Sequence, residues 1–70
     1  MIKIEAPEAY ELVGLRLAQD ARQQFPDREM GPMGCITFTP TVGGLKHVWV
    51  VWRAKSGWVA RWLRYEGDEK

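Results

Sequence analysis

The sequence predicts an α+β fold: an antiparallel sheet of three or four strands with one helix packed on one face, in the order strand, helix, strand, strand, strand. Two observations lead to this prediction. Apolar residues recur at helical spacing in the first third of the chain, and segments rich in β-branched and aromatic residues fill the second half. Because the chain has 70 residues, 46% of them hydrophobic, we expect a single folded domain over residues 1–70 with a thin margin of stability.

The first two elements are a short strand and a helix. Residues 1–5 alternate Ile2 and Ile4 with Lys3, which is typical of a strand. Pro7 suits the first position of a helix, and the residue before Pro26 is pushed out of the helical region. We therefore expect a helix over residues 7–24. Its apolar stripe comprises Tyr10, Val13, Leu17, Ala21 and Phe25, with Ala9 and Leu12 beside it.

Gly14 interrupts this helical pattern. Glycine inside a helix costs about 1 kcal/mol relative to alanine. The sequence offers one structural reason for accepting that cost, which is a close approach of the helix to the sheet at Gly14.

A loop over residues 26–34 is expected next, because this segment contains two prolines and two glycines and has no periodicity. Three strands follow, over residues 35–39, 46–53 and 58–65. A tight turn at Gly43 and Gly44 would place Ile36 and Phe38 beside Trp49 and Val51. A longer loop that starts at Pro40 would shift this register by one residue, and the sequence leaves both arrangements open.

The register of the last hairpin decides which side chains share a face. A three-residue loop over 55–57 places Ala54 opposite Trp58, whereas a four-residue loop pairs Arg53 with Trp58 and places Arg61 beside Val50 and Val48. We favour the first, because a core face rejects an unpaired charge. The face predicted to form the core then comprises Val48, Val50, Trp52, Ala54, Trp58, Ala60 and Trp62. The outward face comprises His47, Trp49, Val51, Arg53, Val59, Arg61, Leu63 and Tyr65.

Both faces of this hairpin carry tryptophan and large aliphatic residues, but the chain supplies one helix, which covers one of them. We therefore expect an uncovered apolar face that serves as a binding or self-association surface. The alternative is that the N-terminal strand and the 26–34 loop, with Met30 and Met33, fold over it.

Charge is distributed unevenly, although the formal net charge is only +1. Residues 30–65 contain no Asp or Glu, and their cations are Lys46, Arg53, Lys55, Arg61 and Arg64. Interleaved arginine and tryptophan suit a protein interface, where Trp, Tyr and Arg dominate the binding energy. They also suit stacking on single-stranded nucleic acid.

The sequence gives little support for catalysis or metal binding. Cys35 and His47 both fall on strands, but no third group or oxyanion feature accompanies them, and a lone cysteine is usually a buried small hydrophobe. Glu8 and Glu11 are explained by the dipole at the start of the helix. We therefore expect no enzyme activity, no cofactor and no metal.

These observations predict a small non-catalytic regulatory or inhibitory protein, which docks its basic β-hairpin face onto a partner protein with an acidic or mixed-charge surface. Single-stranded nucleic-acid binding by the same face is the alternative, and a homodimer that buries this face is a third possibility. The longest apolar run, residues 48–52, is too short to span a bilayer, and the acidic N-terminus does not resemble a secretory signal, so we expect a cytoplasmic protein. The predicted partner-binding residues are His47, Trp49, Arg53, Arg61, Leu63 and Tyr65.

Overall fold

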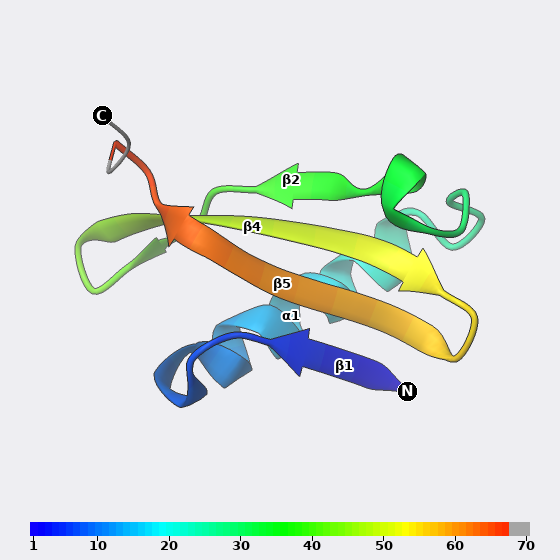
Figure 1. Ribbon diagram of the computed structural model, residues 1–70, viewed down its shortest axis with the longest axis horizontal. Helices are drawn as coiled ribbons and strands as arrows, with labels where there is room; N and C mark the ends of the chain where they lie inside the picture. Colours follow the sequence, from blue (N-terminus) through cyan, green and yellow to red (C-terminus); the bar gives the residue numbers. More distant parts are fainter. Residues whose placement is uncertain (68–70) are drawn as a thin grey trace.

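The computed structural model describes residues 1–67 and combines one α-helix with a five-stranded sheet (Figure 1). The helical elements are the 3-10 turns η1 (Glu8–Tyr10) and η2 (Pro32–Gly34) and the helix α1 (Glu11–Gln24). The strands are β1 (Ile2–Glu5), β2 (Ile36–Phe38), β3 (Thr41–Val42), β4 (Leu45–Ala54) and β5 (Gly57–Tyr65). The predicted α+β class and the order of the main elements are confirmed.

The sheet is mixed, so the prediction of an antiparallel sheet with three or four strands is wrong in this respect. The strand order is β1-β5-β4-β2, and β3 pairs with β4 beyond the end of β2. β1 runs parallel to β5, with Ile2 opposite Trp58, whereas the other pairs are antiparallel. A strand of four residues carries no signal for direction in its own sequence. Its direction depends on the path of the chain between β1 and β5.

The helix ends where the sequence predicts but begins later. α1 stops at Gln24, directly before Phe25 and Pro26, in agreement with the restriction that proline places on the preceding residue. At the other end, Pro7 precedes the 3-10 turn η1, whose Tyr10 N–H donates to the Pro7 carbonyl oxygen at 2.9 Å. The first predicted turn of α-helix is therefore a 3-10 turn, and α1 proper begins at Glu11.

The core lies between α1 and one face of the sheet, and Figure 1 shows α1 behind β4 and β5. Leu17, Ala18 and Ala21 supply the helix side of this core. Small side chains on α1 allow its backbone to approach the large rings of the sheet closely. On the sheet side, the buried core residues are Trp49, Val51, Trp58 and Ala60.

The hairpin of β4 and β5 adopts the register that the sequence analysis rejected. Ala54 pairs with Gly57 around a two-residue turn, and Arg53 pairs with Trp58. Gly57 has a φ of +143°, and a Cβ atom there would lie 1.6 Å from the Met1 carbonyl oxygen, so the first residue of the chain packs directly on this turn. Consequently Trp49 and Val51, rather than Val50 and Trp52, share the core face with Trp58 and Ala60.

The first hairpin resolves the register that the sequence left open. Gly43 and Gly44 both have positive φ values, +58° and +82°, and they connect β3 to β4 in a tight turn. Ile36 lies opposite Val51, and Phe38 lies opposite Trp49. The tight-turn arrangement of these pairs is therefore confirmed.

Candidate interaction surface

The sheet has a second face that no described helix covers. α1 packs on the other face against β1, β4 and β5, and the viewer of Figure 1 looks onto the uncovered side. We refer to this uncovered side as the open face. Strand alternation and the observed register place these side chains on it: Lys3, Glu5, Thr37, Lys46, Val48, Val50, Trp52, Ala54, Val59, Arg61 and Arg64.

A charged and aromatic group forms the centre of the open face. The Arg61 guanidinium carbon lies 5.0 Å from the centroid of the Trp52 ring, in a cation–π arrangement. Arg61 Nε donates a hydrogen bond to Glu5 Oε1 at 2.6 Å, and Lys3 Nζ lies 3.5 Å from Glu5 Oε2. The hydrogen bond from Arg61 lowers the pKa of the Glu5 carboxyl below its ordinary value. Glu5 is therefore ionised at neutral pH.

Aliphatic side chains lie next to this charged group. Val59 sits between Lys3 on β1 and Trp52 on β4, and only 8% of it is exposed because its longer neighbours flank it. Val48 is also buried, and Val50 is partly exposed. The apolar surface of the open face therefore comes mainly from the partly exposed Val50 and Trp52, with cationic side chains beside them.

β5 has a β-bulge opposite Val48 and Trp49, where it contains one more residue than β4. Trp49 pairs with Trp62, but Val48 pairs with Arg64, so Leu63 has no partner residue on β4. Leu63 is 43% exposed. The bulge also returns Arg64 to the open face and Tyr65 to the helix side, where its ring meets Tyr10.

The two sides of the sheet differ in charge. The open face carries four cations, Lys3, Lys46, Arg61 and Arg64. Glu5 lies beside Lys3 and Arg61, and Glu66 lies 3.5 Å from Lys46. Glu11 and Asp20 lie exposed on α1, on the opposite side of the sheet. Arg16 and Arg22 are also exposed on α1, so the helix carries no net charge, whereas the open face is basic.

Of the six predicted partner-binding residues, Arg61 and Leu63 are exposed, and Arg61 lies on the open face. Trp49 and His47 are buried, with 0% and 1% exposure, so their predicted outward orientation is wrong. The observed hairpin register differs from the predicted one by one residue, which reverses the faces of β4 while leaving Trp58 and Trp62 on the core side. Trp52 on the open face was missed for the same reason.

The remaining two predicted residues, Tyr65 and Arg53, make polar contacts with other parts of the chain. Tyr65 lies with its hydroxyl 2.5 Å from that of Tyr10. Arg53 Nη1 donates to the Arg28 carbonyl oxygen at 3.1 Å, and the Arg53 carbonyl oxygen accepts from Gly31 N–H. Arg53 therefore ties the 25–34 loop to β4.

His47 belongs to an aromatic cluster on the helix side. Its ring centroid lies 4.5 Å from that of Tyr10 and 5.1 Å from that of Tyr65, and Trp62 completes the cluster. Cys35 precedes β2 and is exposed, so its expected burial is wrong. An exposed thiol outside this cluster and a buried imidazole within it do not form a nucleophile and base pair in this arrangement.

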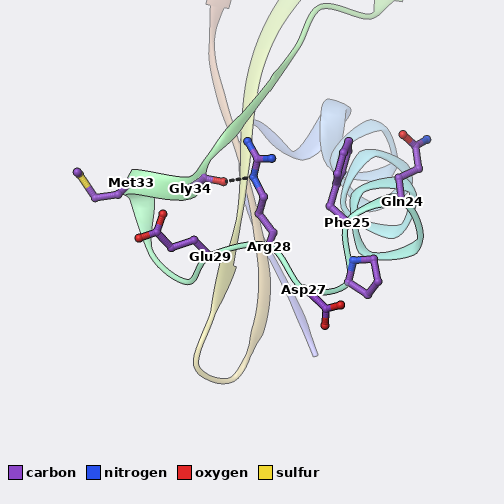
Figure 2. A pocket seen from close by; sticks show the side chains of 8 residues that line it. Gln24, Phe25, Asp27, Arg28, Glu29, Met33 and Gly34 are labelled. Atoms are coloured by element: carbon purple, nitrogen blue, oxygen red, sulfur yellow. Dashed lines mark hydrogen bonds between the residues drawn. The ribbon is translucent and has the colours of Figure 1, made fainter.

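Two hollows lie outside the open face. The first, of about 540 Å³, is bordered by the 25–34 loop (Figure 2). Here the Arg28 side chain lies between the Phe25 ring, 5.5 Å away, and the Gly34 carbonyl oxygen, which accepts from Arg28 Nε at 3.0 Å. The second, of about 560 Å³, lies between α1 and residues 40–42 and includes Leu12, which is 79% exposed.

Comparison of the chain with models of protein families, with curated proteins and with solved structures finds no match. Within residues 1–67, no three His, Cys, Asp or Glu side chains gather in a way that could hold a metal ion. Over the same residues, none of the helices has the length and apolar character needed to cross a membrane.

Proposed function

We propose that this protein is a small non-catalytic, cytoplasmic regulatory or inhibitory protein that binds the acidic surface of a partner protein through its open face. The observation that carries the proposal is the cation–π contact of Trp52 and Arg61 on the open face, on the side of the sheet away from α1. Tryptophan and arginine are the side chains that most often dominate protein interfaces. Occupying a site on the partner would be sufficient for regulation.

The charge distribution supports an acidic partner. Lys3, Lys46, Arg61 and Arg64 lie on the open face, whereas α1 behind the sheet carries two acids and two arginines. A partner with carboxylates around an apolar centre would complement this surface in both charge and character. Such complementarity speeds association and selects the partner.

Single-stranded nucleic-acid binding by the open face is the second candidate. The position of α1 favours it, because the carboxylates of the helix face away from an approaching phosphate backbone. Single-strand binders, however, stack successive bases on several rings. Trp52 is the one aromatic side chain on the open face among the described residues, since Trp49, Trp58, Trp62 and Tyr65 lie on the helix side. The protein partner is therefore the better supported proposal.

The proposal is tested by capture from nuclease-treated native lysate with matched charge variants of the full chain. Arg61→Glu reverses a charge on the open face, and Arg22→Glu makes the same change on exposed α1. We expect the wild type and Arg22→Glu to capture the same discrete protein. Arg61→Glu and Trp52→Ala should capture at least tenfold less of it. Equal loss with Arg22→Glu would indicate a non-specific charge effect, and full retention by Arg61→Glu would exclude the open face.

The nucleic-acid candidate is tested by titrating a labelled oligothymidylate at low and at physiological salt. Four cations on the open face would give a slope of log K against log salt of roughly −3, at about 0.7 per phosphate neutralised. We expect no specific binding. Binding with that slope, lost in Arg61→Glu but retained in Arg22→Glu, would replace the protein partner with nucleic acid.

The homodimer is tested by sedimentation of the wild type. Burial of the open face against a second copy would give a concentration-dependent dimer that Trp52→Ala and Arg61→Glu dissociate. We expect a monomer, because cations on the open face of one copy would meet the same cations on the other.

A further inference from the structure

A carboxylate of the chain itself already occupies the cationic centre of the open face. Glu5 and Arg61 lie directly opposite each other in the parallel pairing of β1 and β5. Glu5 accepts the Arg61 Nε hydrogen bond at 2.6 Å, and Lys3 Nζ lies 3.5 Å from its second oxygen. The Glu5 side chain is only 28% exposed, whereas those of Arg61 and Lys3 are 50% and 71% exposed.

We infer that Glu5 is a tethered competitor, which holds the place that a carboxylate of the acidic partner takes on Arg61 and Lys3. This inference rests on the proposed function and specifies its chemistry. The partner carboxylate would displace the Glu5 side chain from Arg61, or bind beside it against repulsion from a like charge. Glu5 therefore lowers the affinity for every acidic surface, so that only a partner with several carboxylates and additional apolar contact binds tightly enough to displace it.

The geometry supports competition at this particular pair. Arg61 is held between the Trp52 ring and Glu5, so its guanidinium is already oriented for a carboxylate and stacked on an aromatic surface. Glu5 also halves the charge that a partner meets, because the two cations Lys3 and Arg61 together with Glu5 carry a net charge of +1. Removing its charge should strengthen binding of an acidic ligand.

The expected change in affinity on removing the Glu5 charge follows from the exposure of the Glu5–Arg61 ion pair. Ion pairs between exposed side chains contribute little, and breaking one corresponds to roughly a two- to fivefold change in an equilibrium constant. We therefore expect Glu5→Gln to raise the affinity for an acidic ligand about two- to fivefold.

The chain offers a matched control. Glu66 lies 3.5 Å from Lys46, and these side chains are 47% and 54% exposed. Lys46 is close to the β3–β4 turn, away from Arg61 at the middle of β5. Glu66→Gln removes the same charge from the protein as Glu5→Gln and also releases a lysine from an exposed ion pair, so it measures these two effects at a site away from Arg61.

The experiment is an NMR titration of the full chain with a short synthetic peptide rich in glutamate and leucine, following the indole N–H of Trp52 and Nε–H of Arg61. The wild type, Glu5→Gln, Glu66→Gln, Arg61→Ala and the double variant Glu5→Gln/Arg61→Ala are compared. The amide spectrum of each variant reports whether it is folded. Because the readout is at Trp52 and Arg61, binding elsewhere on the chain is recognised as such.

We expect Glu5→Gln to bind the peptide two- to fivefold more tightly than Glu66→Gln, and we expect this gain to vanish in the Arg61→Ala background. Equal affinities of Glu5→Gln and Glu66→Gln would overturn the competitor role while leaving the acidic partner in place. Weaker binding by Glu5→Gln would also overturn it and would show that Glu5 orients Arg61 for the partner. If neither the wild type nor Glu5→Gln shifts the Trp52 signal, the acidic partner itself is excluded.

Discussion

The indole of Trp49 packs against the backbone of Gly14. A Cβ atom on Gly14 would lie 2.5 Å from Cζ3 of Trp49 and 2.9 Å from Cγ2 of Ile4, closer than side-chain atoms approach one another. The close approach of helix to sheet, predicted from the presence of glycine inside a helical pattern, is therefore confirmed. This contact positions α1 over β4 and β1 and leaves the opposite face of the sheet open.

Gly14→Ala should destabilise the protein even though alanine is the better helix former. The gain in helix propensity is about 1 kcal/mol, whereas overpacking against a fully buried tryptophan costs typically 1–3 kcal/mol and here involves two neighbours. We expect a net loss of about 1–2 kcal/mol in the free energy of unfolding, measured in urea. Gln19→Ala, at an exposed position of α1, serves as the control and should cause no loss. A stabilised Gly14→Ala protein would contradict the packing of Trp49 on this glycine.

Trp49→Ala and Trp52→Ala should differ strongly, although the two residues are close on one strand. Trp49 is fully buried, so its truncation leaves a cavity and should cost about 3–5 kcal/mol, enough to unfold a domain of this size. Trp52 lies partly exposed on the open face, so its truncation should cost about 1 kcal/mol. Thermal unfolding followed by circular dichroism measures both. The reverse ranking would restore the hairpin register with Trp52 in the core.

The ion pair of Glu5 and Arg61 should make stability depend on pH in the acidic range. The hydrogen bond from Arg61 depresses the pKa of Glu5 in the folded state relative to its ordinary value of 4.5. The folded state therefore gains stability above that value and loses it as the pH falls through the lowered folded pKa. Urea unfolding at several pH values should show a difference between the wild type and Glu5→Gln that is constant near neutral pH and disappears in acid. A difference that grows on acidification would show that the pKa of Glu5 is raised rather than lowered.

Cys35 should react rapidly with a soluble thiol reagent in the native protein. The residue is exposed immediately before β2, so access does not require unfolding. We expect the native and urea-denatured rates to agree within about an order of magnitude. Cys35→Ser should leave the thermal midpoint unchanged, since no cavity forms at an exposed position. Strong protection of the thiol in the native state would place Cys35 inside the fold.

Several features could be predicted from the sequence because they depend on neighbouring residues. The end of α1 before Pro26 follows from the steric effect of proline on Phe25, and the turn between β3 and β4 follows from two consecutive glycines with positive φ. The uncovered sheet face follows from the presence of one helix beside strands that are apolar on both sides. These conclusions hold whichever register the last hairpin adopts.

The direction of β1, the pairing of β4 with β5 and the position of Leu63 at a bulge were decided by the tertiary structure. Both hairpin registers offer tryptophan and valine to the core, so hydrophobic pattern alone does not separate them. The prediction excluded the pairing of Val50 with Arg61 as the burial of an unpaired charge, but on the open face Arg61 is solvated, stacks on Trp52 and meets Glu5. Glu5 reaches Arg61 only because β1 docks parallel to β5, and residues 56 positions apart carry no local signal of that contact. Local sterics therefore determined the end of α1 and the turn between β3 and β4, whereas long-range packing determined which face of the sheet stays open.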